Sequence, residues 1–317
     1  MTGDFLLRRL LATLPLLLGI SVLLYGILHL SPGGPLDFYA DNPNITPAAL
    51  EQMRVAFGLD RPVWEQYLRW VWAFLQGNWG ISFRTGEPVL AVIAERLPAT
   101  LMLSGLAFVL SLAIAIPVGV LAATRRYSRL DTAVTVLSFS GISVPVFWVG
   151  LMAQLVFAIW LRWLPAGGYE TIGDGSFADR LAHLAMPVAI LSFATVAGWS
   201  RYVRASLIEV MAQDYIRTAR AKGRTRGGAI RWHALRNAML PVVTVVTLDF
   251  VHVVSGAVIT ETIFSWPGIG RLFVEAMDGR DYPVLMGLMM ISSLTLVLAN
   301  LVADLLYALI DPRIRGA

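Results

Sequence analysis

The sequence predicts an all-α membrane protein with six transmembrane helices. Three observations lead to this prediction: the composition, the number of long apolar stretches and the placement of the basic residues. Of the 317 residues, 57% are hydrophobic and 15% are charged, whereas soluble domains usually carry about 25% charged residues. A single soluble core could not hide so much apolar side chain, so a large part of the surface is expected to face lipid.

Six stretches are long enough to cross a membrane, since about 20 apolar residues span the hydrocarbon layer as a helix. They cover residues 10–30, 99–122, 131–160, 181–200, 240–263 and 283–310. The third contains Gly141, Ser143 and Pro145, so a kink is expected there. The first follows Arg8 and Arg9 as a signal peptide would. It exceeds the usual apolar length of about 7–15 residues and no cleavage pattern follows, so we expect a retained helix.

The basic residues gather on one side of the predicted bundle. With the N-terminus inside, the inner segments hold 16 of the 25 basic residues. These segments are 1–9, 123–130, 201–239 and 311–317. The positive-inside rule therefore predicts both termini in the cytoplasm. The expected layout is a first helix within 1–30, an extracytoplasmic segment at 31–98, a five-helix core at 99–310 and a cytoplasmic tail at 311–317.

The outer segment contains two helical patterns, at 46–57 and 64–75. Thr46 followed by Pro47 suits an N-cap with proline at the first helical position. The segment is acidic and contains tryptophan. We therefore expect it to form a compact structure outside the membrane.

The inner loop 201–239 is the most informative segment, with nine basic residues against Glu209 and Asp214. Apolar residues recur in it at three- and four-residue spacing, which predicts an amphipathic helix that Gly223 ends or bends. These residues are Leu207, Ile208, Met211, Tyr215, Ile216 and Ala219. A short helix between two bends suits a groove on a partner protein. Attraction to anionic membrane lipid alone is the alternative, but it does not require a glycine at 223.

The loop resembles the cytoplasmic loop of ABC-importer permeases, whose signature is written EAA, three residues, then G. Ala219 and Gly223 match this signature, whereas Arg217 and Thr218 stand where Glu and the first Ala would be. That departure resembles the peptide/nickel branch, in which R-T-A-R-A-K-G, H-A-L-R-N-A and L-P are usual. Further blocks that resemble this branch lie at 10–31, 163–169, 261–270 and 304–313. The resemblance covers nearly the whole chain and is to the first, B-type, permease subunit.

This resemblance implies a type I importer permease that forms half of a translocation pathway in a prokaryotic inner membrane. The implied solutes are peptides or similar small molecules, with nickel and glutathione-like solutes as open alternatives. The implied partners are a second homologous permease, two cytoplasmic ATPase subunits and an extracytoplasmic solute-binding protein, which residues 31–98 would help to receive. The helix at 214–223 would be the coupling helix that inserts into an ATPase groove. Its candidate contact residues are Asp214, Tyr215, Arg217, Ala219, Lys222 and Gly223.

Several catalytic chemistries are missing from the sequence. There is no cysteine, which excludes thiolate metal sites and cysteine nucleophiles. The only lysine, Lys222, is not part of a Gly-Lys-Ser/Thr motif, so ATP and Mg are expected on the partner subunits and no cofactor on this chain. The four histidines lack H-E-x-x-H spacing, so we expect neither a metal site nor a catalytic residue. The basic balance is assigned to membrane orientation, and no nucleic-acid partner is expected.

Two other classes of protein stay open as alternatives. An intramembrane serine hydrolase would use the Gly-Ile-Ser-Val sequences at 19–22 and 141–144, with His252 as the base. Small residues that pack helices closely explain the same sequences without catalysis. A secondary transporter would need relay groups in several spans and an internal repeat. The spans contain only isolated Asp249 and Asp304, and no such repeat is found.

Asp249 and His252 are the candidate pathway residues. A charged group within a span is costly, and residues three apart share a helix face. Asp249 has two interpretations: it lines the pathway and attracts a substrate ammonium group, or it faces the bundle and pairs with an arginine or a backbone donor. Asp304, near the inner interface, is expected to have a structural role and not to bind substrate.

Overall fold

A computed structural model describes the backbone of residues 3–30, 34, 36, 39 and 45–310, and the side chains within 13–302 of those ranges. The described residues form helices and no strand. Up to the middle of the chain the helices are α1 (Gly3–Leu30), α3 (Pro47–Ala56), α4 (Val63–Leu75), α5 (Val89–Thr124), α6 (Arg129–Ser143), α7 (Val146–Ala153) and the π-helix η1 (Gln154–Trp160). The remaining helices are α8 (Phe177–Met211), α9 (Asp214–Ala221), α10 (Arg226–Ala229), the π-helix η2 (Ile230–Ala234), α11 (Leu235–Asp249), α12 (Val251–Ser255), α13 (Val258–Ile263), α14 (Ile269–Asp278) and α15 (Tyr282–Ile310).

Five helical segments of the described chain are long and apolar enough to cross a membrane. A sixth span is present if α6 and α7–η1 are counted together, because they form a pair bent by 97° at a short break. The break falls at Val144 and Pro145, so the predicted kink is confirmed. Proline at 145 has no backbone N–H to continue the ladder of α6, which explains why the helix ends there.

The predicted spans differ from the helices in three places, one of which is the end of α8, at Met211 and not near 200. Helix α5 begins at Val89 and not near 99, so the end of the predicted outer segment belongs to this helix. The span predicted at 240–263 lies within the apolar segment Arg226–Ile263, but its helix is interrupted after Ser255. The cause is Gly256, whose φ of +83° does not suit a helix, and where a Cβ would lie 2.6 Å from the backbone nitrogen of Gly270.

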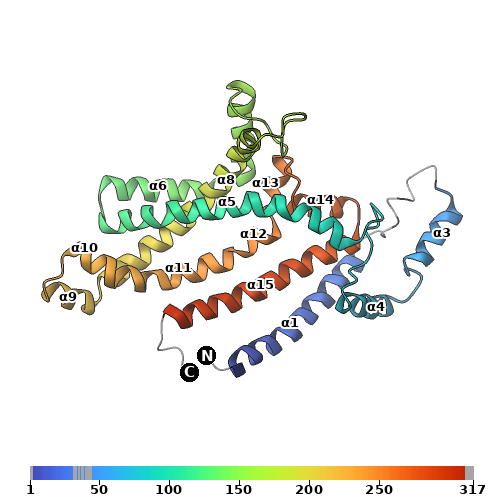
Figure 1. The fold of residues 1–317 in the computed structure, drawn as a ribbon, viewed down its shortest axis with the longest axis horizontal. Coiled ribbons are helices and arrows are strands. Elements are labelled where there is room, and N and C mark those ends of the chain that lie inside the picture. Colours follow the sequence, from blue (N-terminus) through green and yellow to red (C-terminus); the bar gives the residue numbers. More distant parts are fainter. Residues whose placement is uncertain (1–2, 31–33, 35, 37–38, 40–44, 311–317) are drawn as a thin grey trace.

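The long helices run side by side, so that the connections collect at two ends of the bundle (Figure 1). Helices α9 and α10, the α5–α6 turn, the start of α1 and the end of α15 lie at one end. Helices α3, α4 and α14 lie at the other. The segments that the sequence assigned to the inner side thus share one end. The side chain of Asp304 and residues 311–317, for which we made predictions, lie outside the described part.

The outer segment contains the two predicted helices, and this prediction is confirmed. Thr46 caps α3, because its Oγ1 accepts a hydrogen bond from the Ala49 N–H at 3.3 Å and Pro47 is the first helical residue. Helix α4 does not stand free of the membrane helices. It packs against α1, and the Tyr67 hydroxyl lies 2.9 Å from Ser21 Oγ.

The broken segment from α12 to α14 is held against α5 by a buried carboxylate. Glu261 is fully buried and accepts hydrogen bonds from Thr100 Oγ1 at 2.9 Å and from the Arg271 N–H at 3.0 Å. Trp266, also fully buried, donates from Nε1 to the carbonyl of Ala99 at 2.8 Å. These bonds supply partners for polar groups that could not reach water in this position.

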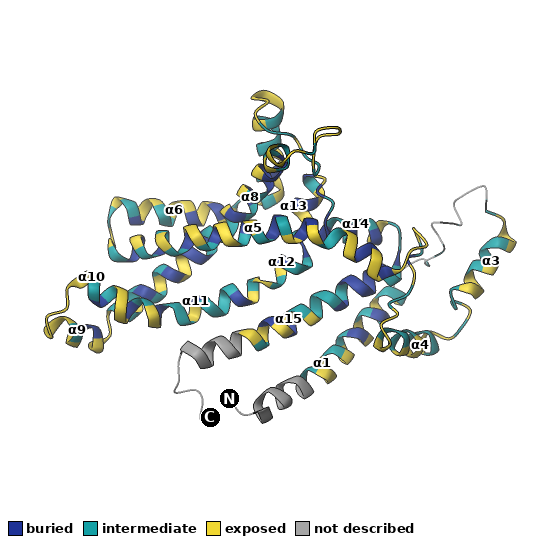
Figure 2. Ribbon diagram, viewed as in Figure 1, coloured by how far each residue is buried: buried dark blue, intermediate teal, exposed yellow. Residues whose placement is uncertain are grey.

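A close helix contact joins α5 and α8. A Cβ added at Gly119 would lie 2.6 Å from the Cβ of Val203 and 2.8 Å from the carbonyl oxygen of Ser200. Small residues allow membrane helices to approach this closely. Figure 2 shows buried residues along these facing helices, whereas α1 and α6 carry many exposed ones. Gly141 packs in the same way against Ala197, which supports packing over catalysis for the Gly-Ile-Ser-Val sequence at 141–144.

This contact predicts opposite effects for two glycine substitutions in α5. Gly119→Ala should lower the thermal midpoint of the purified protein, because overpacking costs about 1–3 kcal/mol. Gly105→Ala is the matched control, since no described atom of another segment lies within 4 Å of its added Cβ. Alanine favours a helix over glycine by about 1 kcal/mol, so the control should keep or raise the midpoint. The midpoints are measured in detergent by tryptophan fluorescence. Equal midpoints for Gly119→Ala and Gly105→Ala would contradict the close contact.

Candidate functional site

Helix α9 is a short helix that projects from one end of the bundle (Figure 1). Asp214 lies in its first turn, where a carboxylate is favoured by the helix dipole. The Arg217 guanidinium lies 3.1 Å from the Asp214 carboxylate, but both side chains are more than 70% exposed. Such an exposed pair contributes little to stability. Asp214, Arg217 and Lys222 therefore present charge to the outside of the protein.

The opposite face of α9 packs on the bundle. Ile216 is buried in an apolar cluster with Ala123 at the end of α5 and Leu207 near the end of α8. Tyr215, by contrast, is exposed, and its hydroxyl accepts a hydrogen bond from Asn237 Nδ2 at 2.9 Å. The predicted amphipathic pattern is thus confirmed for Ile216 and Leu207, whereas Tyr215 lies outside the buried face. A displacement of α9 would act directly on α5 and α8.

Gly223 ends α9 in a left-handed conformation, with φ of +86°. The Gly223 N–H donates to the Arg220 carbonyl at 3.0 Å and the Arg224 N–H donates to the Ala219 carbonyl at 3.2 Å. This pair of bonds is the Schellman arrangement, which favours glycine. The described neighbours leave open space around an added Cβ. The backbone conformation, and not crowding, is therefore what requires glycine here, as the sequence predicted.

An ion pair with a buried carboxylate joins α6 to α8, the helix that precedes α9. Asp131, at the start of α6, is 3% exposed and binds Arg204 of α8 through two hydrogen bonds of 2.5 and 2.9 Å. The Tyr127 N–H donates to the same carboxylate at 2.9 Å. Sequence reasoning missed this pair, although Ser128 followed three residues later by Asp131 is a recognisable helix start. The brace fixes the α5–α6 turn to α8 next to the loop.

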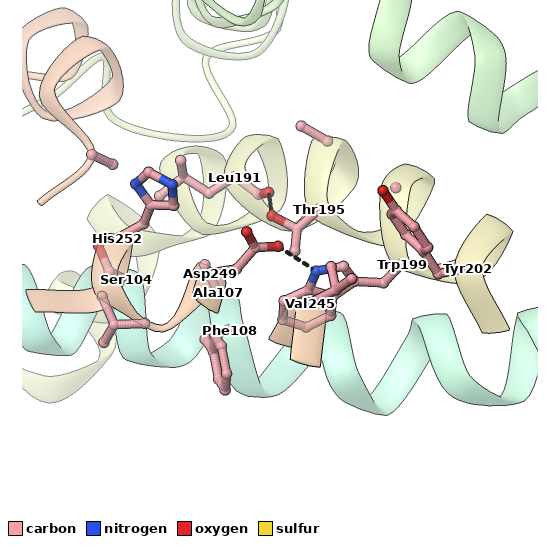
Figure 3. Close-up of a pocket in the computed structure, with 14 residues that line it drawn as sticks. Ser104, Ala107, Phe108, Leu191, Thr195, Trp199, Tyr202, Val245, Asp249 and His252 are labelled. Carbon is pink, nitrogen blue, oxygen red and sulfur yellow. Dashed lines mark hydrogen bonds between the residues drawn. The ribbon is translucent and has the colours of Figure 1, made fainter. Parts of the chain in front are cut away.

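A cavity of about 420 Å³ lies between α5, α8, α11 and α12. Figure 3 shows its walls, which are mostly apolar, and its polar groups. The polar and aromatic side chains that matter for its chemistry are Ser104, Phe108, Thr195, Trp199, Asp249 and His252. Both pathway residues named from the sequence therefore line one cavity. The helix is interrupted between them, because α11 ends at Asp249 and α12 starts at Val251.

Asp249 accepts a hydrogen bond from the indole N–H of Trp199, with 2.7 Å between Oδ2 and Nε1 (Figure 3). Trp199 is 2% exposed and stands edge-on to Phe108, so its position is fixed by packing. Asp249 itself is half-buried, and neither an arginine nor a backbone N–H of the described residues pairs with it. The structure thus supplies a donor that the sequence did not predict. One carboxylate oxygen, Oδ1, is left for another partner.

Ser104 adds a second polar group to the cavity. It is 6% exposed, and its hydroxyl has no hydrogen-bond partner among the described residues. His252 is exposed at the cavity and shares no hydrogen bond with any serine in the described part of the chain. The arrangement can hold a polar or cationic group beside an apolar one. Within the described residues no group of three potential metal ligands is found.

A bundle of long apolar helices, a projecting glycine-capped helix and a cavity between the long helices are features expected of a membrane permease. The chain belongs to the family of binding-protein-dependent transport system inner membrane components, whose model matches residues 115–316. The N-terminal model of the same transport systems matches residues 2–104. Together with the apolar helices, this establishes a multi-pass membrane protein. The family prediction from the sequence is confirmed.

Relatives match over nearly the whole chain. The Bacillus subtilis oligopeptide transport system permease protein AppB is 44% identical over 312 residues, covering 98% of each chain. The Escherichia coli K12 dipeptide transport system permease protein DppB is 40% identical over 336 residues, again covering 98% of each. A putative peptide permease protein of Brucella suis is 42% identical over 315 residues, with 98% of both chains covered.

A solved structure has the same fold. A chain of the MetNI methionine ABC transporter, in inward-facing conformations, superposes with a TM-score of 0.57 at 16% identity. The match covers 70% of the present chain and 97% of the other. The predicted fold of a type I importer permease is confirmed. The neighbours are ABC-transporter permeases, so the alternatives of a secondary transporter and a serine hydrolase are not supported.

Proposed function

We propose that this chain is the permease subunit of an ATP-driven importer for peptides or similar small solutes in a prokaryotic inner membrane. The observation that carries the proposal is the full-length similarity to oligopeptide and dipeptide permeases at 40–44% identity. Uptake of a labelled dipeptide by the assembled importer in vesicles is the direct test. Nickel and glutathione-like solutes are the competing substrates to be tried beside it.

The chain works as one of two related permeases in this proposal. A second homologous permease completes the pathway, and a solute-binding protein delivers the substrate from outside. Two cytoplasmic ATPase subunits bind ATP and Mg, since the sequence has no Walker A motif. The many exposed apolar residues on the long helices are left for membrane lipid and for the second permease.

The segment 214–223 is the coupling element of the proposed mechanism. Its exposed residues, among them Asp214, Arg217 and Lys222, contact an ATPase groove, while Ile216 anchors it to α5 and α8. Closure of the ATPase pair on ATP displaces α9, and the brace between Asp131 and Arg204 carries this displacement into α6 and α8. The bundle opens to the outside, receives the solute, and hydrolysis resets it.

Gly223→Val is expected to uncouple ATP hydrolysis from uptake. A β-branched residue at positive φ costs about 1–3 kcal/mol, which is sufficient to displace the cap of α9 in most molecules. Uptake per ATP hydrolysed should fall about tenfold, with normal membrane insertion. Gly227→Val is the matched control, because its backbone has no positive φ and no described atom lies within 4 Å of its added Cβ. Normal uptake and normal ATPase recovery in the Gly223 variant would refute the coupling role.

The proposed orientation places 31–98 outside and α9 in the cytoplasm. Because the chain has no cysteine, an introduced thiol is its only one. Asn78→Cys, at an exposed position, should react with a membrane-impermeant maleimide in intact cells, whereas exposed Arg224→Cys should react only after permeabilisation. The reverse labelling pattern would reverse the topology and the direction of transport.

Asp249 is the proposed cation-binding group of the pathway. Oδ2 is held by Trp199, so Oδ1 is available to a substrate ammonium group that enters the cavity. Hydrogen bonds to charged groups are worth about 1.5–3 kcal/mol, which is large enough to govern passage. The structural alternative assigns Asp249 only to fixing Trp199.

Asp249→Asn separates these two roles, because asparagine keeps an acceptor for Trp199 and loses the charge. Uptake of cationic peptides by the assembled complex should fall about tenfold relative to anionic peptides, at normal complex yield. Trp199→Phe is the comparison variant, since it removes the indole donor and keeps the carboxylate. It should lower stability without changing the preference for peptide charge. Equal loss of both peptide classes in Asp249→Asn would assign the residue to structure alone.

A further inference from the structure

Helix α4 packs against the apolar span of α1 although it is part of the predicted outer segment. Its Tyr67 hydroxyl lies 2.9 Å from Ser21 Oγ, inside the apolar span Thr13–Leu30 of α1. From Ser21 to Leu30 the helix rises about 13 Å at 1.5 Å per residue. A tyrosine side chain reaches only part of this distance, so the backbone of α4 lies below the outer end of α1. Figure 1 shows α4 beside that end of α1, at the margin of the bundle.

The surface of α4 divides into three sectors at 100° per residue. The first faces the bundle: Tyr67 meets the ring of Tyr25 at 5.3 Å, and Trp70 and Phe74 continue the aromatic row along the helix. The second sector is polar and includes Glu65 and Arg69. The third is an exposed apolar stripe formed by Trp64, Leu68, Trp72 and Leu75, whose exposed fractions are 65%, 56%, 67% and 73%.

The polar sector carries charged side chains, which favour contact with water. Glu65 accepts hydrogen bonds from Arg61 at 2.7 Å and from Arg69 at 3.1 Å. The bond from Arg61, more than any other cause, lowers the pKa of the Glu65 carboxyl, so the group is charged at neutral pH. Charged groups on one sector and an apolar stripe beside it are typical of a helix that lies in the plane of a membrane interface.

We propose that α4 is an interfacial helix whose stripe of Trp64, Leu68, Trp72 and Leu75 is covered by the acyl chains and headgroups of the lipid leaflet at that end of the bundle. The adjoining helix α1 also exposes apolar side chains, since Leu18, Val22 and Ile27 are more than 50% exposed in a span that is almost unburied. Tryptophans at headgroup depth complete the pattern, since their rings prefer this boundary.

Two other occupants would require a different position of the helix. A binding protein reaches only surfaces in water, and the contact with Ser21 places α4 below the end of the span. The second permease would bury the stripe in protein, together with the adjoining exposed face of α1. The lipid assignment does not depend on the transported solute or on the direction of transport.

The test uses nitroxide labels on the complete importer in lipid nanodiscs, with any partner cysteines replaced. Leu68→Cys and Trp72→Cys report on the stripe, and Arg69→Cys reports on the polar sector of the same turn. Collision with oxygen, which concentrates in lipid, is compared with collision with a water-soluble nickel chelate. Both stripe labels should collide at least several-fold more with oxygen relative to nickel than the Arg69 label does.

Three outcomes would overturn the proposal. Nickel access at the stripe equal to that at Arg69 would place the stripe in water. Protection of both stripe labels from both reagents would show that a protein subunit covers them. Oxygen preference at Arg69 as strong as at Leu68 would show that α4 is immersed on all sides and does not lie at an interface. Labelling at two stripe positions guards against one variant that fails to assemble.

Discussion

Helices α5 and α8 are in close contact, because Gly119 lies directly against Val203 and the carbonyl of Ser200. Both candidate sites are built from this pair. The ends of the pair next to α9 supply Ala123 and Leu207, which receive Ile216 of the projecting helix. Its middle part supplies Ser104 and Trp199 to the cavity. A pair packed at this density cannot deform gradually, so motion at one end is transmitted as displacement of a rigid unit.

The segment from α12 to α14 depends on a second constraint, the burial of Glu261, which forms no salt bridge with the described residues. Its carboxylate is bound by Thr100 and by backbone N–H groups of the α12–α14 segment. Such a site needs close backbone approach, since a Cβ at Gly268 would collide with the Glu261 carboxylate and a Cβ at Gly270 with the backbone of Val258. The interrupted helix therefore lets the backbone surround the Glu261 carboxylate and bind it. Non-helical backbone at membrane depth is tolerated where its polar groups are satisfied by protein.

Local signals in the sequence predicted what is local in the structure. The kink before Pro145, the cap at Thr46 and the left-handed Gly223 each follow from the chemistry of one residue and its neighbours. The bonds from Trp199 to Asp249 and from Arg204 to Asp131 join residues 50 and 73 positions apart. No periodicity or motif in one sequence records such pairing. The depth of α4 was hidden for the same reason, since it depends on the contact with α1.

The composition of the cavity suits transport more than retention. Its walls are largely apolar. Its described polar groups are the Asp249 carboxylate, of which Trp199 binds one oxygen, the unpartnered hydroxyl of Ser104 and a few further side chains. A site that conducts must bind well enough to admit the solute and weakly enough to release it. A single carboxylate oxygen can align a charged amino group, but it does not distinguish one peptide side chain from another. On the proposed function, discrimination among solutes therefore falls to the binding protein, and the permease contributes a charge preference and a path.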